Sequence, residues 1–386
     1  MREPAIVESK ANTFYLKKKG ISKGCQQCLR GAKAVLFLNG ICQNPRHCWW
    51  YCPISKNRKG KEDTYINEIK ITSKEQILQE LKAINAKGIS ITGGDPLFEP
   101  NLEKTLEYIK FIKKYKGSKF HIHLYTNGLN FNEEIANKLA RAGLDEIRFN
   151  PSKENWDVIK FALNKGISVG AEVPVIPEVE YIDNLKKNIV FLNEIGADFI
   201  NLNEFEFCSP NSQNLKDRNF KLKLGTIASV KNSKKYAIQL VKDIAPKVSI
   251  KIHFCTIKAK DHWQLKERYL RRAKTIKLPY EQVTSEGLLL FAQIEGEKKD
   301  IIDFYTILLD DINIPKNYLS YQERNIKLSI AFAIEDSFIN LLTQNNLEGY
   351  AVEMTPFRED LYQQITEKTP IKLFKEEMGL NENRHG

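Results

Sequence analysis

Between residues 34 and 254, short apolar segments typical of buried strands alternate with longer segments typical of amphipathic helices. The strand candidates are residues 34–38, 89–92, 121–126, 146–150, 168–175, 199–202 and 248–254. The helix candidates between them are residues 77–84, 102–112, 133–142, 155–164, 184–194 and 227–244. Strands that alternate with helices in this way pair in parallel. Six or seven such units predict an α/β fold, a partial (β/α)6-type TIM-like barrel whose active site lies at the carboxyl ends of its strands.

The pattern changes after Pro279. Strand-like residues 287–294, 327–334 and 350–355 and helix-like residues 301–309 and 338–342 predict a small C-terminal α+β domain. We therefore expect five parts along the chain. They are an N-terminal cysteine-containing segment (1–33), the barrel (34–256), a basic helical connector (257–280), the small domain (281–375) and a flexible polar tail (376–386).

Composition excludes several classes of protein. Of the 386 residues, 42% are hydrophobic and 28% are charged, which excludes a disordered or fibrous chain. No apolar run reaches the roughly 18 residues of a membrane span, and the N-terminus does not resemble a secretory signal. Seven cysteines in such a chain predict a reducing, cytoplasmic location and favour metal binding or catalysis over disulfides.

Three cysteines, Cys42, Cys48 and Cys52, directly follow the first predicted strand. Three thiolates on one loop at the mouth of a barrel suit an iron-sulfur cluster that keeps one iron open to another ligand. A structural zinc site with His47 as fourth ligand is the alternative, and buried cysteines that bind nothing are a further one.

A second element, Gly93-Gly94-Asp95-Pro96, ends the next strand. Two glycines allow a ligand close to the backbone, and a carboxylate suits an ammonium group. The same four residues also suit an ordinary tight turn. Their position one βα unit after the three-cysteine loop favours a shared binding site.

Over residues 24–254 these motifs resemble the radical S-adenosylmethionine (radical SAM) superfamily. The resemblance implies that Cys42, Cys48 and Cys52 bind a 4Fe-4S cluster and that Tyr51 lies near the adenine. It implies that Gly93, Gly94, Asp95 and Pro96 hold the methionine amino group, with Asp95 in place of the usual Glu. Thr126-Asn127-Gly128 resembles the family's Thr-Asn-Gly turn. Residues 31–38 and 52–55 look like an archaeal branch related to pyruvate formate-lyase activating enzymes.

The cysteine spacing departs from the family pattern. Five residues separate Cys42 from Cys48 and three separate Cys48 from Cys52, so Trp50 is an alternative to Tyr51 beside the adenine. The resemblance implies S-adenosylmethionine (SAM) and a one-electron donor as partners, with cleavage of a carbon-sulfur bond to methionine and a 5'-deoxyadenosyl radical. Four residues near later strand ends are candidate contacts of the SAM carboxylate or ribose: Arg148, Asn150, Glu172 and Asn201. Each suits a helix cap or a pair inside the barrel equally well.

The other four cysteines allow a second metal site. Cys25 and Cys28 form a C-x2-C pair, and Cys255 ends the last predicted barrel strand. With Cys208 they supply four ligands for a second iron-sulfur cluster or for zinc. Cys208 is alternatively an ordinary loop thiol.

Positive charge concentrates between residues 251 and 280, which contain nine basic and two acidic residues of a chain with net charge +11. Trp263 and Tyr269 lie among them. This pattern predicts RNA, above all tRNA, as the substrate, with candidate contacts at Lys266, Arg268, Arg271 and Arg272. A protein substrate is the close alternative, because the resembling activases act on proteins. A solvated basic face that packs against the barrel is the structural alternative, and a zinc-stabilised nucleic-acid-binding protein without catalysis is the alternative from another class.

Overall fold

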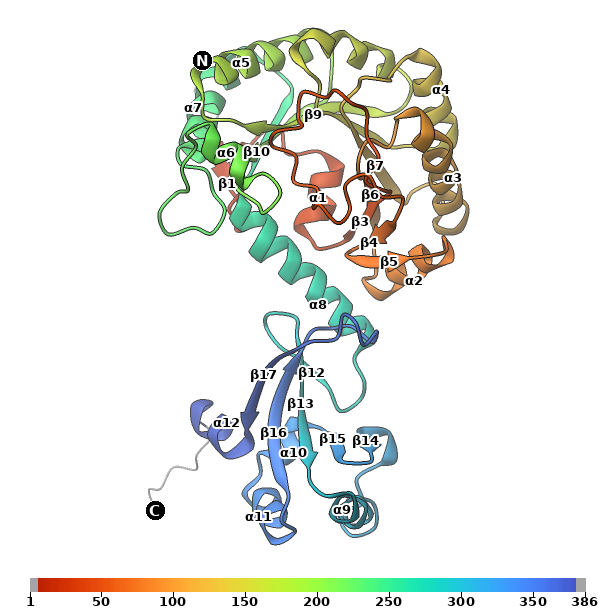
Figure 1. Ribbon diagram of the computed structural model, residues 1–386, viewed down its shortest axis with the longest axis vertical. Coiled ribbons are helices and arrows are strands. Elements are labelled where there is room, and N and C mark those ends of the chain that lie inside the picture. Colours follow the sequence, from red (N-terminus) through yellow and green to blue (C-terminus); the bar gives the residue numbers. More distant parts are fainter. Residues whose placement is uncertain (1–5, 380–386) are drawn as a thin grey trace. The chain divides into compact units, whose positions relative to one another are not determined.

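The computed structural model describes residues 6–379 (Figure 1). The chain forms two compact units, one ending at Leu265 and one beginning at Lys266. Between residues 6 and 379, no helix combines the length and the apolar character that crossing a membrane requires. Most of the predicted tail, residues 380–386, lies outside the described residues, and its first two residues, 376 and 377, are instead the end of a helix that begins at Ile371.

The first unit is built on one twisted sheet of eleven strands, in the order β1-β2-β11-β10-β9-β8-β7-β6-β3-β4-β5. Its parallel strands are β3 (Lys33–Phe37), β6 (Gly88–Thr92), β7 (His121–Thr126), β8 (Glu146–Phe149), β9 (Ser168–Val175), β10 (Phe199–Glu204) and β11 (Lys251–Cys255). Antiparallel strands extend both edges: β1 (Ile6–Glu8) and β2 (Phe14–Leu16) beside β11, and β4 (Thr64–Ile66) and β5 (Ile69–Ile71) beside β3. The sheet does not close on itself, which confirms the predicted partial α/β barrel.

Helices cover the outer face of this sheet (Figure 1). They are α2 (Glu75–Ala83), α3 (Glu99–Lys116), α4 (Glu133–Ala142), the 3₁₀ helix η1 (Lys153–Ala162), α5 (Val179–Glu194) and α7 (Ser233–Ile244). Strand alternation determines which side chains meet them. On β7, for example, Ile122 and Leu124 belong to the apolar core, and His121, His123 and Tyr125 therefore face the concave interior. The interior of the barrel is polar as a consequence.

Helix α1 (Lys23–Leu29) lies within the curve of the sheet (Figure 1). The Ser22 hydroxyl caps it by accepting a hydrogen bond from the Cys25 N–H at 3.4 Å, and the Gly24 N–H donates to Glu146 at 2.9 Å. A Cβ atom on Gly24 would lie 2.4 Å from the guanidinium of Arg148, so only glycine allows this approach. The first cysteine pair of the chain is thereby placed inside the barrel.

The second unit is an antiparallel sheet with helices packed on it. Its strand order is β14-β15-β13-β16-β17, and β12 also pairs with β13. The strands are β12 (Gln282–Val283), β13 (Leu289–Glu295), β14 (Leu319–Gln322), β15 (Asn325–Leu328), β16 (Glu348–Met354) and β17 (Ile365–Pro370). The helices are α8 (Leu265–Ile276), of which Leu265 belongs to the first unit, α9 (Lys298–Asp310), the 3₁₀ helix η4 (Lys316–Tyr318), α10 (Ile330–Ala333), α11 (Asp336–Gln344) and α12 (Ile371–Glu377).

One strand prediction in this unit is wrong over half its length. Residues 327–334 were expected to be extended, but β15 ends at Leu328 and α10 begins at Ile330. A short continuous apolar run does not distinguish a strand from a buried helix, and here the chain is helical from Ile330 on, with Ser329 at the N-cap position. The small α+β architecture itself is confirmed.

Candidate functional site

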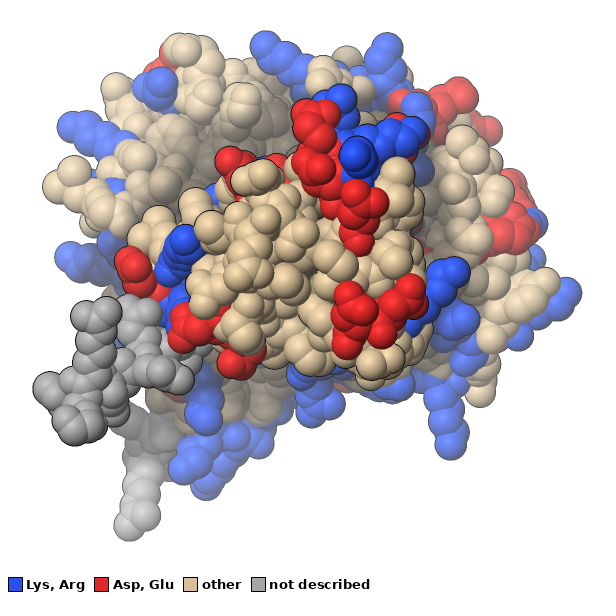
Figure 2. Space-filling view, turned by 90° about the horizontal axis from the view of Figure 1, so that it is seen from below, with Lys and Arg blue, Asp and Glu red and all other residues tan. Residues whose placement is uncertain are grey.

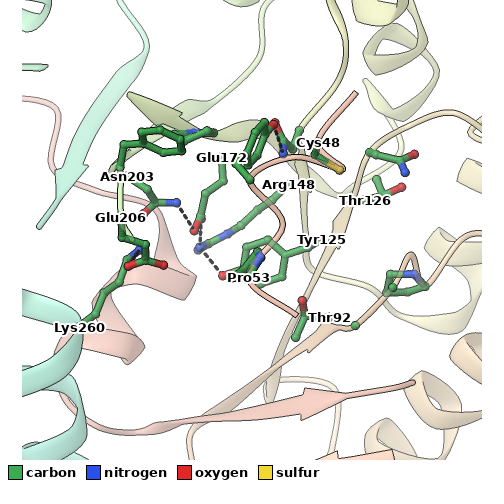
Figure 3. Close-up of a pocket in the computed structure, with 18 of the residues that line it drawn as sticks. Cys48, Pro53, Thr92, Tyr125, Thr126, Arg148, Glu172, Asn203, Glu206 and Lys260 are labelled. Atoms are coloured by element: carbon green, nitrogen blue, oxygen red, sulfur yellow. Dashed lines mark hydrogen bonds and ion pairs between the residues drawn. The ribbon is translucent and has the colours of Figure 1, made fainter. Parts of the chain in front are cut away.

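Two neighbouring cavities open at the carboxyl ends of the parallel strands. One, of about 300 Å³, reaches into the barrel past Tyr125, Arg148 and Glu172 (Figure 3). The other, of about 730 Å³, is lined by the loop that follows β3. Cys48, Tyr51, Gly93 and Gly94 belong to both walls. The two motifs found in the sequence therefore meet at one place.

The three loop cysteines, Cys42, Cys48 and Cys52, all line the larger cavity. Burial, followed by the nearby Asp95 carboxylate, raises the pKa of Cys42 to about 12, and burial and the Cys52 thiol raise the pKa of Cys48 to about 11. Within residues 6–379, no three His, Cys, Asp or Glu side chains stand close enough together to ligate a metal ion. Three soft sulfur donors on one wall nevertheless suit an iron-sulfur cluster, which would replace their protons.

His47, the fourth ligand of the zinc alternative, does not join this group. It lines another cavity, of about 570 Å³, together with Trp156 and Tyr181. Burial lowers the pKa of its imidazole. A Cys₃His zinc site on this loop therefore has no support in the arrangement of side chains.

The Gly93-Gly94 turn lies directly against the backbone that leads to Cys42. The Gly94 N–H donates to the Asn39 carbonyl at 2.7 Å, and the Asp95 N–H donates to the Ile41 carbonyl at 3.0 Å. A Cβ on Gly94 would lie 1.9 Å from that Ile41 oxygen, and Gly93 has a φ of +144°. Both glycines are therefore required by the close contact between the turn and the cysteine loop.

Asp95 departs from its predicted role. Its side chain is only 1% exposed, and its carboxylate accepts hydrogen bonds from the Leu97 N–H at 2.8 Å, the Asn127 N–H at 2.9 Å and the Thr126 hydroxyl at 3.0 Å. Burial raises the pKa of this carboxyl. Because the carboxylate is occupied by these donors and lines neither cavity, it holds two turns together and does not face a ligand ammonium group.

The turn after β7 completes this wall. Thr126 and Asn127 line the smaller cavity, and the Asn127 amide donates to the Gln43 side chain at 3.0 Å and to the Cys42 sulfur at 3.9 Å. The turns after β6 and β7 thus both touch the cysteine loop.

Tyr51 and Trp50 have different environments. Trp50 is 3% exposed and stacks on Phe220 with ring centroids 6.0 Å apart, while the Arg218 guanidinium lies 4.2 Å from the Trp50 ring. Tyr51 lines both cavities, and its hydroxyl lies 3.4 Å from the Asn150 amide. Trp50 is therefore a packing residue, and the alternative that it replaces Tyr51 beside a ligand is wrong.

Two residues that hold this aromatic pair have no signal in the sequence. Asn211 donates to the Tyr51 carbonyl and Asn214 donates to the Trp50 carbonyl, each at 3.1 Å. Asn214 lies in α6 (Ser212–Asp217) and Asn211 directly precedes it. Their role depends on a contact more than 150 residues away in the chain, so no local pattern could reveal it.

Arg148 organises the floor of the smaller cavity (Figure 3). It is 2% exposed and donates to Glu146 and Glu172 at 2.5 Å each, to the Tyr125 hydroxyl at 3.2 Å and to the Ser22 hydroxyl at 3.1 Å. Burial alone would raise the pKa of Glu172. The positive charge of Arg148 and the hydrogen bond from Asn203 outweigh burial, so the pKa of Glu172 is lowered. The charges on this floor are satisfied by one another.

Of the four candidate contacts at strand ends, three line a cavity and one does not. Arg148, Asn150 and Glu172 line the smaller cavity. Asn201 is 1% exposed and donates to Glu172 at 3.1 Å, so it pairs within the barrel.

The remaining cysteines divide as well. Cys25 and Cys28, on α1, lie near enough to Cys255, on β11, to contribute to the raised pKa of its thiol, after burial. Cys208 interacts with Cys52 and Glu206 instead. The four cysteines expected to share one site therefore lie in two places, Cys208 being nearer the loop cysteines, and within residues 6–379 they do not gather closely enough to ligate one metal ion.

The basic segment is largely occupied by structural contacts. Lys266 pairs with Glu286 at 3.0 Å, and Arg272, 4% exposed, donates to the Pro356 carbonyl at 2.6 Å. Arg268 and Arg271 are also engaged by other groups. Figure 2 shows basic side chains interspersed with acidic ones, not one continuous basic surface, on the face that it presents. Arg272 is therefore withdrawn as a candidate nucleic-acid contact, because its guanidinium is buried.

The two predicted stacking residues of that segment are packed too. Tyr269 contacts Phe357 with ring centroids 5.9 Å apart, and the Trp263 indole N–H donates to the Leu29 carbonyl at 2.8 Å.

Comparisons with known proteins agree with this site. Residues 42–170 match the family model of the radical SAM superfamily. A Methanocaldococcus jannaschii protein, named provisionally as a glycyl-radical enzyme activating enzyme, is 34% identical over 354 residues, which cover 89% of each chain. The GTP 3',8-cyclase of Aquifex aeolicus is 29% identical over 145 residues, 36% of this chain and 44% of that protein.

A solved structure, Streptococcus suis SuiB bound to its precursor peptide, aligns at 13% identity with a TM-score of 0.43, covering 67% of this chain and 58% of that one. The family match spans the cysteine loop, the Gly-Gly turn and the strands that carry Tyr125 and Arg148, and the M. jannaschii relative extends the similarity over nearly the whole chain. The chain therefore belongs to the radical SAM superfamily, and it is a radical SAM enzyme.

Proposed function

We propose that this radical SAM enzyme is an activating enzyme that acts on a protein and leaves an unpaired electron on a glycine of that protein. The observation that carries the proposal is the 34% identity, over 89% of both chains, to a relative named as an activating enzyme of glycyl-radical enzymes. Similarity on this scale includes the second unit as well as the barrel.

Cys42, Cys48 and Cys52 would hold the 4Fe-4S cluster that family membership implies, because they share one cavity wall. Tyr51, Gly93, Gly94, Asn127 and Asn150 would face SAM, because they line the adjoining cavity. When bound, the cluster and SAM supply one-electron cleavage of a carbon-sulfur bond and so a 5'-deoxyadenosyl radical. The chain's own residues supply position: the two glycines let their turn lie against the cysteine loop, and Asp95 joins that turn to the turn after β7.

The charges deeper in the cavity support a peptide substrate. Arg148 is paired with two carboxylates, and Lys260 lies 3.6 Å from Glu206. The wall contains three carboxylates, of Glu172, Glu204 and Glu206, against two cations. Such a wall has no excess positive charge for a phosphate, whereas the Tyr125 hydroxyl and the Asn203 amide can hydrogen-bond neutral peptide groups.

The test uses anaerobically reconstituted full-length protein with SAM and dithionite. Purified glycyl-radical enzyme from the same organism is added in one arm and total tRNA of that organism in the other. We expect the protein arm to show an organic radical by electron paramagnetic resonance and increased 5'-deoxyadenosine release. Stimulation by tRNA without a protein radical would overturn the proposal in favour of an RNA substrate.

A further inference from the structure

Large apolar side chains are exposed around the mouth of the barrel. Most of those exposed in the first unit lie on segments that leave the carboxyl ends of its parallel strands: Trp49, Leu129, Val179, Tyr181, Leu222, Leu224 and Ile227. Leu224 is 96% exposed and Ile227 is 87% exposed. Exposed apolar side chains that gather at one edge of a protein mark a surface that another molecule covers.

The two most exposed of these side chains lie at the tip of a short hairpin, residues 221–231. The hairpin lies between α6 and α7 and extends away from the sheet (Figure 1). Two backbone hydrogen bonds of 2.8 Å join its arms, from the Lys231 N–H to the Lys221 carbonyl and from the Lys223 N–H to the Ser229 carbonyl. The apolar tip therefore stands on a hydrogen-bonded backbone.

The base of the hairpin packs against the cysteine loop. Phe220, directly before the hairpin, stacks on Trp50, and the buried Val230 belongs to the same apolar cluster. The Val230 N–H donates at 3.0 Å to the carbonyl of Phe205, which lines the smaller cavity. Tyr181 also contacts Trp50, with ring centroids 6.2 Å apart. The base thus belongs to the wall of the site, whereas the tip residues are not members of this cluster.

Charge differs between the two sides of this surface. Residues 216–235, which include the hairpin, contain seven basic residues and one acidic residue. Lys221 and Lys223, on either side of Leu222, are exposed. The start of α5 carries Glu178 and Glu180 instead. A partner that covers both sides needs acidic groups opposite the hairpin and basic groups opposite α5, and this pattern sets its orientation.

A protein substrate needs such a surface. A glycine of a folded protein reaches the cavity only if the enzyme also binds the protein around that glycine. The hairpin is placed for this contact, because Glu206, which lines the cavity, pairs with Ser229 of the hairpin. Apolar side chains between lysines suit an apolar groove with an acidic border on a protein. RNA offers no such groove, and neither SAM nor a small reductant requires a surface of this extent.

We propose that the tip of the hairpin, together with Trp49, Val179 and Tyr181, is the docking surface for the protein substrate. This inference rests on the proposed function, which supplies the occupant. Leu224 and Ile227 enter an apolar groove on the substrate, and the neighbouring lysines face acidic groups at its border. The surface acts in binding alone, so cleavage of SAM without a substrate does not depend on it.

The first test measures binding. Reconstituted native chain is titrated anaerobically with purified glycyl-radical enzyme of the same organism, before SAM or reductant is added. Leu224→Ser combined with Ile227→Ser should raise the Kd about tenfold or more. Tyr115→Ser, 58% exposed at the end of α3, is the matched control and should bind as the native chain does. Lys221→Gln combined with Lys223→Gln should weaken binding at low salt and reduce its salt dependence.

The second test adds SAM and dithionite to the same proteins. The double serine variant should release 5'-deoxyadenosine at the native rate without substrate, and its kcat/KM for forming the protein radical should fall about tenfold or more. Because dithionite is a small reductant, docking of an electron-donor protein does not explain such a loss. An equal midpoint of denaturant unfolding in the native chain and the variant shows that the fold is kept.

The outcomes separate this inference from the proposed function. Native Kd and native kcat/KM in the double serine variant would overturn the inference and leave the proposed function standing. If the native chain forms no radical on the protein, both are overturned. Slower release of 5'-deoxyadenosine by the variant without substrate would assign the tip to positioning the cysteine loop and overturn the inference. Binding of the native chain to anionic phospholipid vesicles, lost in the variant while substrate binding is native, would assign the tip to a membrane and overturn it too.

Discussion

The Asp95 carboxylate accepts a hydrogen bond from the Asn127 backbone N–H at 2.9 Å and so joins the turn after β6 to the turn after β7. The same carboxylate accepts from the Thr126 hydroxyl and from the Leu97 N–H. Asp95 is therefore a positioning residue: its carboxylate binds groups of the protein's own turns. What it positions are Gly93, Gly94 and Asn127, which line the cavities beside the three cysteines.

Asp95→Asn tests this role, because it keeps the size of the side chain and replaces one acceptor by a donor that faces backbone N–H groups. We expect a loss of about 1–3 kcal/mol in the free energy of unfolding and weaker SAM binding, with the iron content of the reconstituted protein unchanged. Denaturant unfolding and equilibrium dialysis with SAM measure the two effects. Asp157→Asn, at an exposed position, is the matched control. Native stability combined with native SAM affinity would contradict the role.

Gly94→Ala tests the close approach of the turn to the cysteine loop. The new Cβ would lie 1.9 Å from the Ile41 carbonyl oxygen, so the loop must move and SAM binding should fall at least tenfold, about 1.4 kcal/mol. Gly60→Ala is the control, since Gly60 has open space around it and a φ of +73°, and should cost about 1 kcal/mol of stability without affecting SAM. If both variants bind SAM alike, the contact does not shape the site.

The longer strands and helices of the barrel were predictable from the sequence, because their apolar residues recur with different periods in strands and in helices. The predicted bounds of β7, β9 and α4 are those of the structure. The edge strands β1, β2, β4 and β5 escaped prediction since each has only three residues, too few to show an alternation.

The site was predictable where one local motif carries it and not where partners are distant in sequence. The cysteine loop and the Gly-Gly turn are short, and their proximity follows from parallel strands ending at one edge. Arg148 shows the limit: its partners Ser22, Tyr125 and Glu172 come from three other segments, so its buried ion pairs could not be read from the residues around it. Arg272 shows the same limit, because its burial depends on Pro356 and Phe357.

His123 predicts a pH dependence of stability. Its imidazole faces Lys33, His121, Tyr125 and Arg148, and burial followed by the positive charges of Arg148 and Lys33 lowers its pKa well below the ordinary value. The unfolded chain then binds a proton below about pH 6.5 that the folded chain does not, so stability falls by about 1.4 kcal/mol per pH unit from this group as pH decreases.

His123→Gln should remove that share of the slope between about pH 6.5 and 5, measured by denaturant unfolding at each pH. His253 still contributes to the pH dependence of stability in this variant, because burial lowers the pKa of its imidazole to about 4. The exposed His262→Gln is the control and should leave the slope native. An unchanged slope in His123→Gln would show that the imidazole is protonated in the folded protein.

Arg148→Met tests the charged floor of the cavity. It leaves the carboxylates of Glu146 and Glu172 buried without their cation, which should cost about 3–5 kcal/mol of stability at neutral pH. The cost should shrink toward pH 5, since the two carboxyls, released from Arg148, can then take up protons. Arg141→Met, on the exposed face of α4, should be near neutral at every pH. A cost that is equal at pH 5 and pH 8 would exclude the electrostatic explanation.

Counting 5'-deoxyadenosine tests whether Cys42, Cys48 and Cys52 build the site of radical SAM chemistry. Reconstituted protein is incubated anaerobically with SAM and dithionite, and 5'-deoxyadenosine and methionine are quantified for the native chain, Cys48→Ala and the control Cys208→Ala. We expect equal amounts of both products from the native chain and from Cys208→Ala, and none above background from Cys48→Ala. Cleavage by Cys48→Ala at the native rate, or no cleavage by the iron-loaded native chain, would contradict it.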